Sequence, residues 1–253
     1  MAVMLLPIDG LPEVRPGDDL AALLIDAIER SRMGLKAADV VVVCQKVISK
    51  AEGRVVDLAT VEPGERAQRF AESYDKDARV VEVALREATD VVRMGDGHLI
   101  TRTGAGWVAA NSGIDRSNQA DEDCLTLLPE VPDASAARLR ASLSEHFAVP
   151  VAVIVTDTWG RAWRLGQIDF AIGAAGIQVL EDHSGRLDRN GRPLEHTMIA
   201  VADQMAAAAG LLMEKSAGVA AVLVRGARYS VPEGAEDRGA RSMVRPPEDD
   251  LFR

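Results

Sequence analysis

Aromatic residues are scarce in this sequence, at 4% of 253 residues, although 47% of the chain is hydrophobic. A core must therefore consist mainly of valine, leucine, isoleucine and alanine. The chain is long enough to build one large domain, or two small lobes, around such a core. Cysteine is nearly absent as well. Cys44 and Cys124 have no C-x-x-C spacing and no accompanying histidines, which argues against a structural zinc site and against a disulfide framework.

Positive charge is also in short supply, because 29 lysines and arginines against 39 acidic residues leave a formal net charge of -10. This balance argues against a surface for nucleic acids. An acidic protein that binds anionic substrates needs metal ions or local arginines. No stretch reaches the length of a transmembrane helix, and residues 1–7 lack the features of a signal peptide. We therefore expect a cytoplasmic protein with no membrane partner.

The two common nucleotide-binding motifs are missing. The sequence contains no P-loop of the form G-x-x-x-x-G-K-[ST]. Residues 104–109 fit a loose G-x-G-x-x-A fingerprint, but a short apolar run and Asn111-Ser112-Gly113 follow it in place of a helix. The context of a Rossmann dinucleotide site is therefore absent. Any nucleotide site in this chain must be of another kind.

What the sequence does contain is a mixture of helical and strand patterns, which predicts an α/β fold in a single domain spanning residues 1–253, with two lobes as a variant. Continuous β-branched runs predict buried strands, and apolar residues at helical spacing predict amphipathic helices. The predicted strands are 40–44, 99–101, 108–110, 149–155 and 219–224. The predicted helices are 20–33, 64–73, 77–93, 133–147 and 197–215, and we expect irregular structure after Gly226.

Three polar segments follow predicted strands, at residues 45–53, 111–118 and 156–167, and we predict that they are loops. Polar residues at strand ends are where α/β proteins commonly build their sites. In the third segment, Asp157 and Thr158 offer the oxygen ligands that Mg²⁺ prefers. Arg161 and Arg164 follow and could clamp phosphate oxygens as catalytic cations. The alternative is a capped turn with two solvated arginines.

The other two segments carry weaker signals. Asp115 could be a second metal ligand beside Asp157, because a metal that bridges phosphates usually needs more than one carboxylate. The alternative is an Asx-turn, which aspartate forms readily. Lys50 could meet a phosphate, and the alternative is a surface lysine that extends its charge into solvent. The four histidines show no metal-binding spacing, and we assign them no role.

Taken together, the segments resemble the coenzyme F420-0:L-glutamate ligase family (F420 is a deazaflavin cofactor), in the form without the flavin-binding reductase domain that some relatives carry. The resemblance extends from Leu11 to the C-terminus. The matching strings are VISKAEG at 47–53, NSGIDRSN at 111–118, TDTWGR at 156–161, AIGAAG at 171–176, VAD at 201–203 and VRG at 224–226.

The resemblance implies GTP-dependent addition of L-glutamate to F420-0, followed by further γ-linked additions. It also implies two divalent cations, Mg²⁺ or Mn²⁺, and allows K⁺ as a further ion. The implied architecture is an unusual α/β fold in an intertwined homodimer.

Roles for individual residues also come from this resemblance. By motif position, Asp115 and Asp157 resemble ligands of one metal and Thr158 a ligand of the other, and Glu214 is a further candidate metal ligand. Gln45 and Lys46 occupy a place where some relatives carry smaller hydroxyl residues. The implied nucleotide contacts are Leu11, Pro12, Glu13, Val14, Gln45, Lys50 and Asn118.

Two other functions remain open from the sequence. One is a different nucleotide- and metal-dependent ligase or phosphotransferase, which would keep the metal segments and change the acceptor. The other is a non-catalytic regulator that binds a nucleotide. GTP cleavage that requires both acceptor and glutamate separates the proposed ligase from both alternatives.

Overall fold

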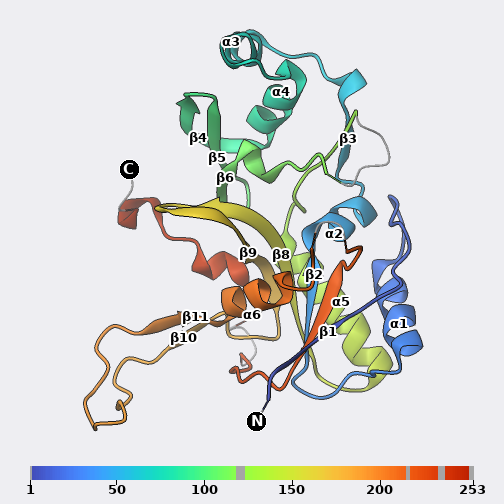
Figure 1. Cartoon of the computed structure of the whole chain (residues 1–253), viewed down its shortest axis with the longest axis vertical. Helices are drawn as coiled ribbons and strands as arrows, with labels where there is room; N and C mark the ends of the chain where they lie inside the picture. The colour runs from blue at the N-terminus through green and yellow to red at the C-terminus, as the bar shows by residue number, and fades with distance from the viewer. Residues whose placement is uncertain (1, 118–122, 215–216, 233–236, 251–253) are drawn as a thin grey trace.

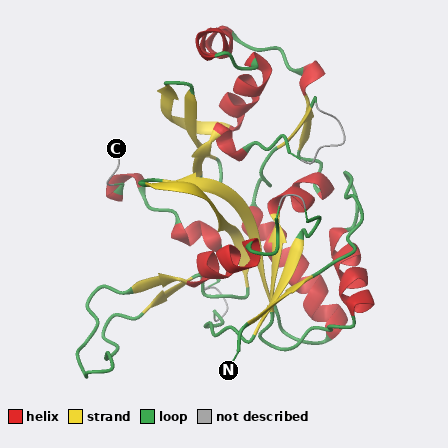
Figure 2. Cartoon of the chain, viewed as in Figure 1, coloured by secondary structure: helices red, strands yellow, loops and turns green. Residues whose placement is uncertain are grey.

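The computed structural model describes residues 2–117, 123–214, 217–232 and 237–250. Its centre is a five-stranded sheet in the order β1-β12-β2-β8-β9 (Figures 1 and 2). β2 and β8 are parallel, and the other neighbours are antiparallel. The strands are β1 (Met4–Pro7), β2 (Val40–Cys44), β8 (Ala152–Arg161), β9 (Arg164–Ala175) and β12 (Ala221–Arg225).

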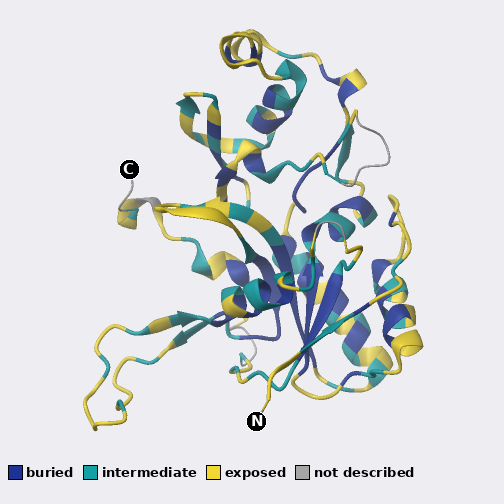
Figure 3. Ribbon diagram, in the orientation of Figure 1, coloured by how far each residue is buried: buried dark blue, intermediate teal, exposed yellow. Residues whose placement is uncertain are grey.

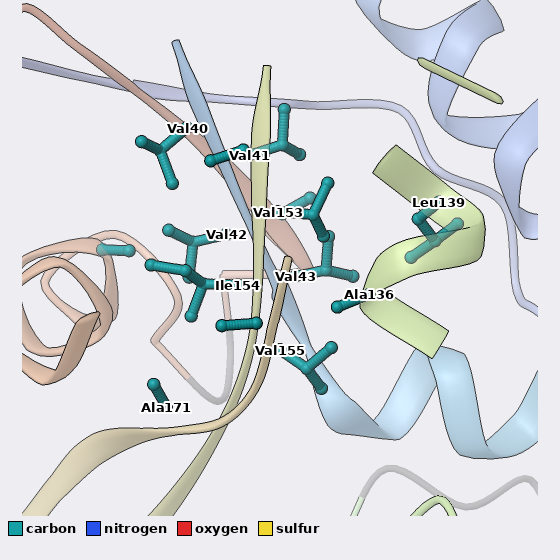
Figure 4. Packing of buried hydrophobic residues seen from close by; sticks show 14 of the residues in the cluster. Val40, Val41, Val42, Val43, Ala136, Leu139, Val153, Ile154, Val155 and Ala171 are labelled. Atoms are coloured by element: carbon teal, nitrogen blue, oxygen red, sulfur yellow. The ribbon is translucent and has the colours of Figure 1, made fainter. Parts of the chain in front are cut away.

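β2 and the first half of β8 are continuously apolar because helices cover both faces of the sheet there. Residues 40–43 of β2 are fully buried, as are residues 152–155 of β8 (Figure 3). Such a strand lacks the alternation of a half-exposed one. Helices α1 (Leu20–Ser31) and α5 (Pro132–Phe147) lie on one side of the sheet and α6 (Val201–Gly210) on the other. Leu139 and Ala136 of α5 pack toward the valines of the sheet (Figure 4).

A second lobe, above the sheet in Figure 1, has small cores of its own. Its three-stranded sheet, in the order β4-β5-β6, packs with two helices. A separate two-stranded sheet pairs β3 with β7. The elements are β3 (Val55–Asp57), α3 (Glu65–Tyr74), α4 (Ala78–Glu87), β4 (Ala88–Gly95), β5 (His98–Thr103), β6 (Val108–Ala110) and β7 (Cys124–Thr126). Short 3-10 helices cover Leu58–Thr60, Asn111–Gly113, Ala240–Met243 and Pro247–Asp249.

A two-stranded arm projects from the main lobe (Figure 1). It consists of β10 (Leu180–Asp182), β11 (Met198–Ala200) and the long loop between them. No residue from 180 to 200 is among the buried hydrophobic residues. None of the helices in the described ranges has the length and apolar character that a membrane crossing requires.

Several helices and strands of the structure differ from the predicted elements in their ends or in their type. The predicted helix 77–93 is wrong beyond Glu87, where the chain turns into β4. The predicted helix 197–215 is shorter, because residues 198–200 pair with β10 as β11 before α6 begins. The first polar segment is not a loop, since α2 (Gln45–Ala51) follows β2 without a break. The third is the far end of the β8–β9 hairpin.

Candidate active site

A cavity of about 690 Å³ opens where the two lobes meet the end of the central sheet. Its walls come from the segment before α1, the start of α2, β8, the second lobe and the segment between α6 and β12. Most of the residues predicted from the sequence to bind nucleotide or metal line this one space. These are Leu11, Pro12, Glu13, Val14, Gln45, Lys50, Asp115, Asp157, Thr158 and Glu214.

The parallel pairing of β2 and β8 brings two of the polar segments together. Cys44 at the end of β2 is in register with Thr156 of β8. Parallel strands end at the same edge of a sheet, so Gln45 and Asp157 follow at neighbouring places. Asp157 lies on the β8–β9 hairpin, where it faces Phe170 across the pair. The hairpin continues the sheet beyond this edge and thereby holds the Asp157 carboxyl in place.

Asp115 arrives from the second lobe. Its backbone is bridged to Thr126, and its carboxylate Oδ1 accepts a hydrogen bond of 2.6 Å from the Ser117 N–H. The Asx-turn proposed as the alternative is therefore present, and the same carboxylate lines the cavity. Lys46 of α2 spans the lobes, with its Nζ 2.9 Å from Asp115 Oδ2 and 2.7 Å from Ser117 Oγ. The pKa of Asp115 is lowered: burial opposes the shift, but the Ser117 and Lys46 donors outweigh it.

Asp157 has the opposite shift. Burial raises its pKa to about 7, and the negative charges of Asp115 and Asp169 add to the effect, whereas the Thr158 N–H and Lys46 oppose it. A buried carboxyl near two others resists ionisation until a cation or a donor arrives. The Thr158 hydroxyl donates a hydrogen bond to Asp169 Oδ1. Asp169 was not predicted from the sequence, because its proximity depends on the pairing of β8 with β9.

The two predicted nucleotide contacts on α2, Lys50 and Gln45, differ in their hydrogen-bond partners. Lys50 Nζ forms a 2.5 Å ion pair with Glu13 Oε1, so two residues predicted as separate contacts neutralise each other. Gln45 is fully buried and accepts a hydrogen bond of 2.8 Å from Ser49 Oγ. Its Nε2 has no hydrogen-bond partner among the described residues. A buried donor of this kind is costly unless something satisfies it.

Comparison with known proteins identifies the family. The family model F420-0:Gamma-glutamyl ligase matches residues 10–226. The chain belongs to this family. Proteins named Coenzyme F420:L-glutamate ligase are similar to it over nearly their full length. The one from Methanothermobacter thermautotrophicus is 39% identical over 100% of both chains. The one from Methanopyrus kandleri is 44% identical over 95% of this chain and 94% of its own. The one from Archaeoglobus fulgidus is 41% identical over 100% and 97%.

In this member of the ligase family, the remaining predicted residues lie outside the cavity or outside the described ranges. Arg161 and Arg164 pair with each other at the far end of the β8–β9 hairpin. Neither is among the residues that line the cavity. Asn118 falls outside the described residues. The further residues that line the cavity include Lys46 and Cys44, and burial raises the pKa of the Cys44 thiol to about 11.

The donor set of the cavity suits a hard divalent cation. Asp115, Asp157 and Thr158 all offer oxygen, which Mg²⁺ and Mn²⁺ prefer over nitrogen and sulfur. Within the described ranges, no three acidic, histidine or cysteine side chains come together as a complete binding group. An ion held here would therefore need further oxygen ligands, from the phosphates of a nucleotide or from water. Such a partly protein-bound ion is typical of Mg²⁺ in nucleotide sites.

Proposed function

We propose that this protein joins L-glutamate to coenzyme F420-0 at the expense of GTP and then adds further γ-linked glutamates. The observation that carries the proposal is the gathering of Asp115, Asp157, Thr158 and Lys50 in one cavity. The names of the full-length relatives support the acceptor and the amino acid.

The reaction requires activation of a carboxylate. The γ-phosphoryl group of GTP passes to the acceptor carboxylate, so that an acyl phosphate forms and GDP leaves. The glutamate amine then attacks the acyl carbon, the new C–N bond forms, and the bond to the phosphate oxygen breaks. The amine loses a proton, and inorganic phosphate is released. In both bond-forming steps negative charge develops on oxygen atoms, and positive charge near those atoms lowers the barrier.

We assign the binding of the nucleotide and the stabilisation of its phosphates to different residues. Lys50 and the segment Leu11, Pro12, Glu13 and Val14 hold the nucleotide together with Gln45, whose free Nε2 is available as a donor. Asn118 is the further nucleotide contact that the family motif implies. Arg161 and Arg164 are the catalytic cations for phosphate groups that extend out of the cavity along the β8–β9 hairpin.

Two divalent cations, Mg²⁺ or Mn²⁺, would complete the site, with K⁺ as an additional ion. Asp115 and Asp157 would hold one of them, and Thr158 with Glu214 the other. When bound, the cations neutralise the triphosphate and polarise the transferred phosphoryl group. The net charge of -10 makes local cations necessary, because the protein as a whole repels a triphosphate.

An intertwined homodimer is part of the proposal, and the β10–β11 arm supports it. An isolated two-stranded hairpin is only marginally stable in water. The loop of the arm carries Arg186, Arg189 and Arg192 against Asp188 and Glu195, on a chain that is otherwise acidic. Its exposed Leu187 gives it an apolar contact as well. A second acidic copy of this chain fits both properties.

The test is mass spectrometry of the products after incubation of the protein with F420-0, glutamate, GTP and Mn²⁺. We expect a mass increase of one glutamyl residue, followed by larger products, together with GDP. Omission of F420-0 should abolish GDP release, and omission of glutamate should limit it to the GDP that accompanies formation of one acyl phosphate per site. GDP release with no addition of glutamate to F420-0 would contradict the ligase proposal. Intact GTP in a protein that binds it would indicate a regulator.

A further inference from the structure

Lys46 is the residue that the proposed ligase chemistry leaves without a role. Its Nζ contacts Asp115 Oδ2 at 2.9 Å, Ser117 Oγ at 2.7 Å and the Ser117 carbonyl oxygen at 2.9 Å. An ammonium group has three donors, so these contacts account for all of them. The side chain is only 12% exposed. Lys46 therefore holds a defined position and is not a flexible surface lysine.

In this position Lys46 donates to a carboxylate oxygen of Asp115, which is a proposed metal ligand. Asp115 Oδ2 accepts from Lys46, and Asp115 Oδ1 accepts from the Ser117 N–H at 2.6 Å. Both carboxylate oxygens therefore already accept a hydrogen bond from the chain itself. The charge of Lys46 also reaches the Asp157 carboxyl, the other proposed ligand of the same ion. A divalent cation between the two carboxylates meets a positive charge that is already in place.

We propose that Lys46 is a built-in competitor of the divalent cation, so that the free ion binds weakly and enters together with the nucleotide. The proposal rests on the proposed function, because it takes Asp115 and Asp157 as the metal ligands. When a nucleotide arrives, its phosphates offer the Lys46 ammonium a new anionic partner. The Asp115 oxygen is released for the ion at the same time.

Lys50 provides a matched control on the same helix. It lies one turn further along α2 and also lines the cavity. Its ion pair is with Glu13, however, at 2.5 Å. The two lysines therefore carry the same charge in the same cavity, but Lys46 contacts the proposed metal ligand Asp115 whereas the ion pair of Lys50 is with Glu13. A general effect of removing positive charge would appear in both variants.

The experiment is direct measurement of Mn²⁺ binding to the nucleotide-free full-length protein, by electron paramagnetic resonance and calorimetry. We expect Lys46→Met to bind Mn²⁺ at least about tenfold more tightly than the natural protein, which is about 1.4 kcal/mol. Lys50→Met should change the affinity much less. Lys46→Gln removes the charge and keeps a polar amide in the side chain, and it gives the same test if the methionine variant does not fold.

A second measurement adds GDP. In the natural protein GDP should tighten Mn²⁺ binding more than it does in the Lys46 variants. GDP draws Lys46 away from Asp115 in the natural protein, whereas the variants have no lysine there to compete with the ion. Unchanged or weaker Mn²⁺ affinity in both Lys46 variants would overturn the proposal, as would an equal gain in Lys50→Met. Glutamate transfer by the natural protein is measured separately, so failure of the ligase proposal remains distinguishable.

Discussion

Asp157 and Cys44 line the same cavity, and burial raises the pKa of both. The consequences differ because the two groups start from different values. The Cys44 thiol, with a pKa of about 11, stays neutral at physiological pH and is no nucleophile. The Asp157 carboxyl, with a pKa of about 7, is near the point at which a cation would convert it to the charged form. Of these two groups, Asp157 is therefore the one whose charge changes when a cation binds.

Replacement of Asp157 by Asn keeps its size and removes its negative charge. We expect metal binding to weaken and glutamate transfer to fall at least about a hundredfold, or roughly 2.7 kcal/mol of lost transition-state stabilisation. Steady-state kinetics with saturating Mn²⁺ measures the loss, and thermal unfolding checks that the fold is intact. Near-normal transfer by a well-folded variant would remove Asp157 from the site.

Asp115→Asn serves as the partner variant. It should cause a similar loss of turnover, and the double variant should cost much less than the sum, since groups that hold one ion act as a unit. If the role of Asp115 is confined to the Asx-turn with Ser117, the variant will keep both its turnover and its stability, because the Oδ1 of Asn can accept the same hydrogen bond. The two outcomes are separated by measuring both quantities on the same preparation.

The thiol chemistry of Cys44 gives a prediction that needs no substrate. At pH 8 a thiol with a pKa near 11 is ionised about a hundredfold less than one with the ordinary value of 9.0. We expect iodoacetamide to modify Cys44 about a hundred times more slowly than a free cysteine, measured in a Cys124→Ser background. Unfolding in urea should restore the ordinary rate. Fast modification in the folded state would show that the thiol is accessible and ionised.

At the scale of elements, the β8–β9 hairpin determines the site, because it carries Asp157, Thr158 and Asp169. Its inner end is packed tightly against α5: a Cβ added to Gly173 would lie 2.5 Å from the backbone carbonyl carbon of Pro132. Gly160 on the outer part of the same hairpin has nothing within 4 Å of an added Cβ. The hairpin is therefore closely packed at its inner end, near Gly173, and loosely packed at its outer end, near Gly160.

Gly173→Ala should destabilise the protein by about 1–3 kcal/mol, as overpacking of a core usually does. Denaturant unfolding followed by circular dichroism measures the free energy of unfolding. Gly160→Ala, the same change in the same hairpin, should have little effect on it. Equal stabilities of the two variants would mean that α5 and β9 move apart without cost.

At the scale of the whole molecule, the arm between β10 and β11 is the feature that a single copy does not explain. We expect sedimentation to show a dimer at micromolar concentration. Replacement of residues 184–196 by a short glycine-containing turn should shift the equilibrium toward monomer. The stability of each monomer should change little, because the arm contributes no buried hydrophobic residue to the core.

A polar change within the intact arm is the milder version of this experiment. Leu187→Ser should weaken association, whereas Leu211→Ser, at an equally exposed position after α6, should not. Sedimentation of the natural protein as a monomer would contradict the proposed dimer. If the variant without the arm still sediments as a dimer, the interface lies elsewhere.

The strongest sequence signals were those with one structural meaning. The continuous valines of residues 40–43 predict a buried strand because they are β-branched, and the predicted helix that begins near residue 133 is also present. Residues 45–53 were misread as a loop, because their polar side chains face a cavity and leave no apolar stripe on that side of α2. Residues 156–167 were misread because glycine and arginine are common in turns, although here they extend a hairpin.

The sequence by itself determined the family, the α/β class and the residue types that make the chemistry plausible, since these depend on composition and on local order along the chain. Only the tertiary structure decided which of those residues meet. The pairing of β8 with β9 placed Asp169 beside Thr158, and the packing of the second lobe on α2 joined Lys46 to Asp115. Contacts between residues so far apart in the chain depend on strand register and lobe packing, which no local pattern encodes.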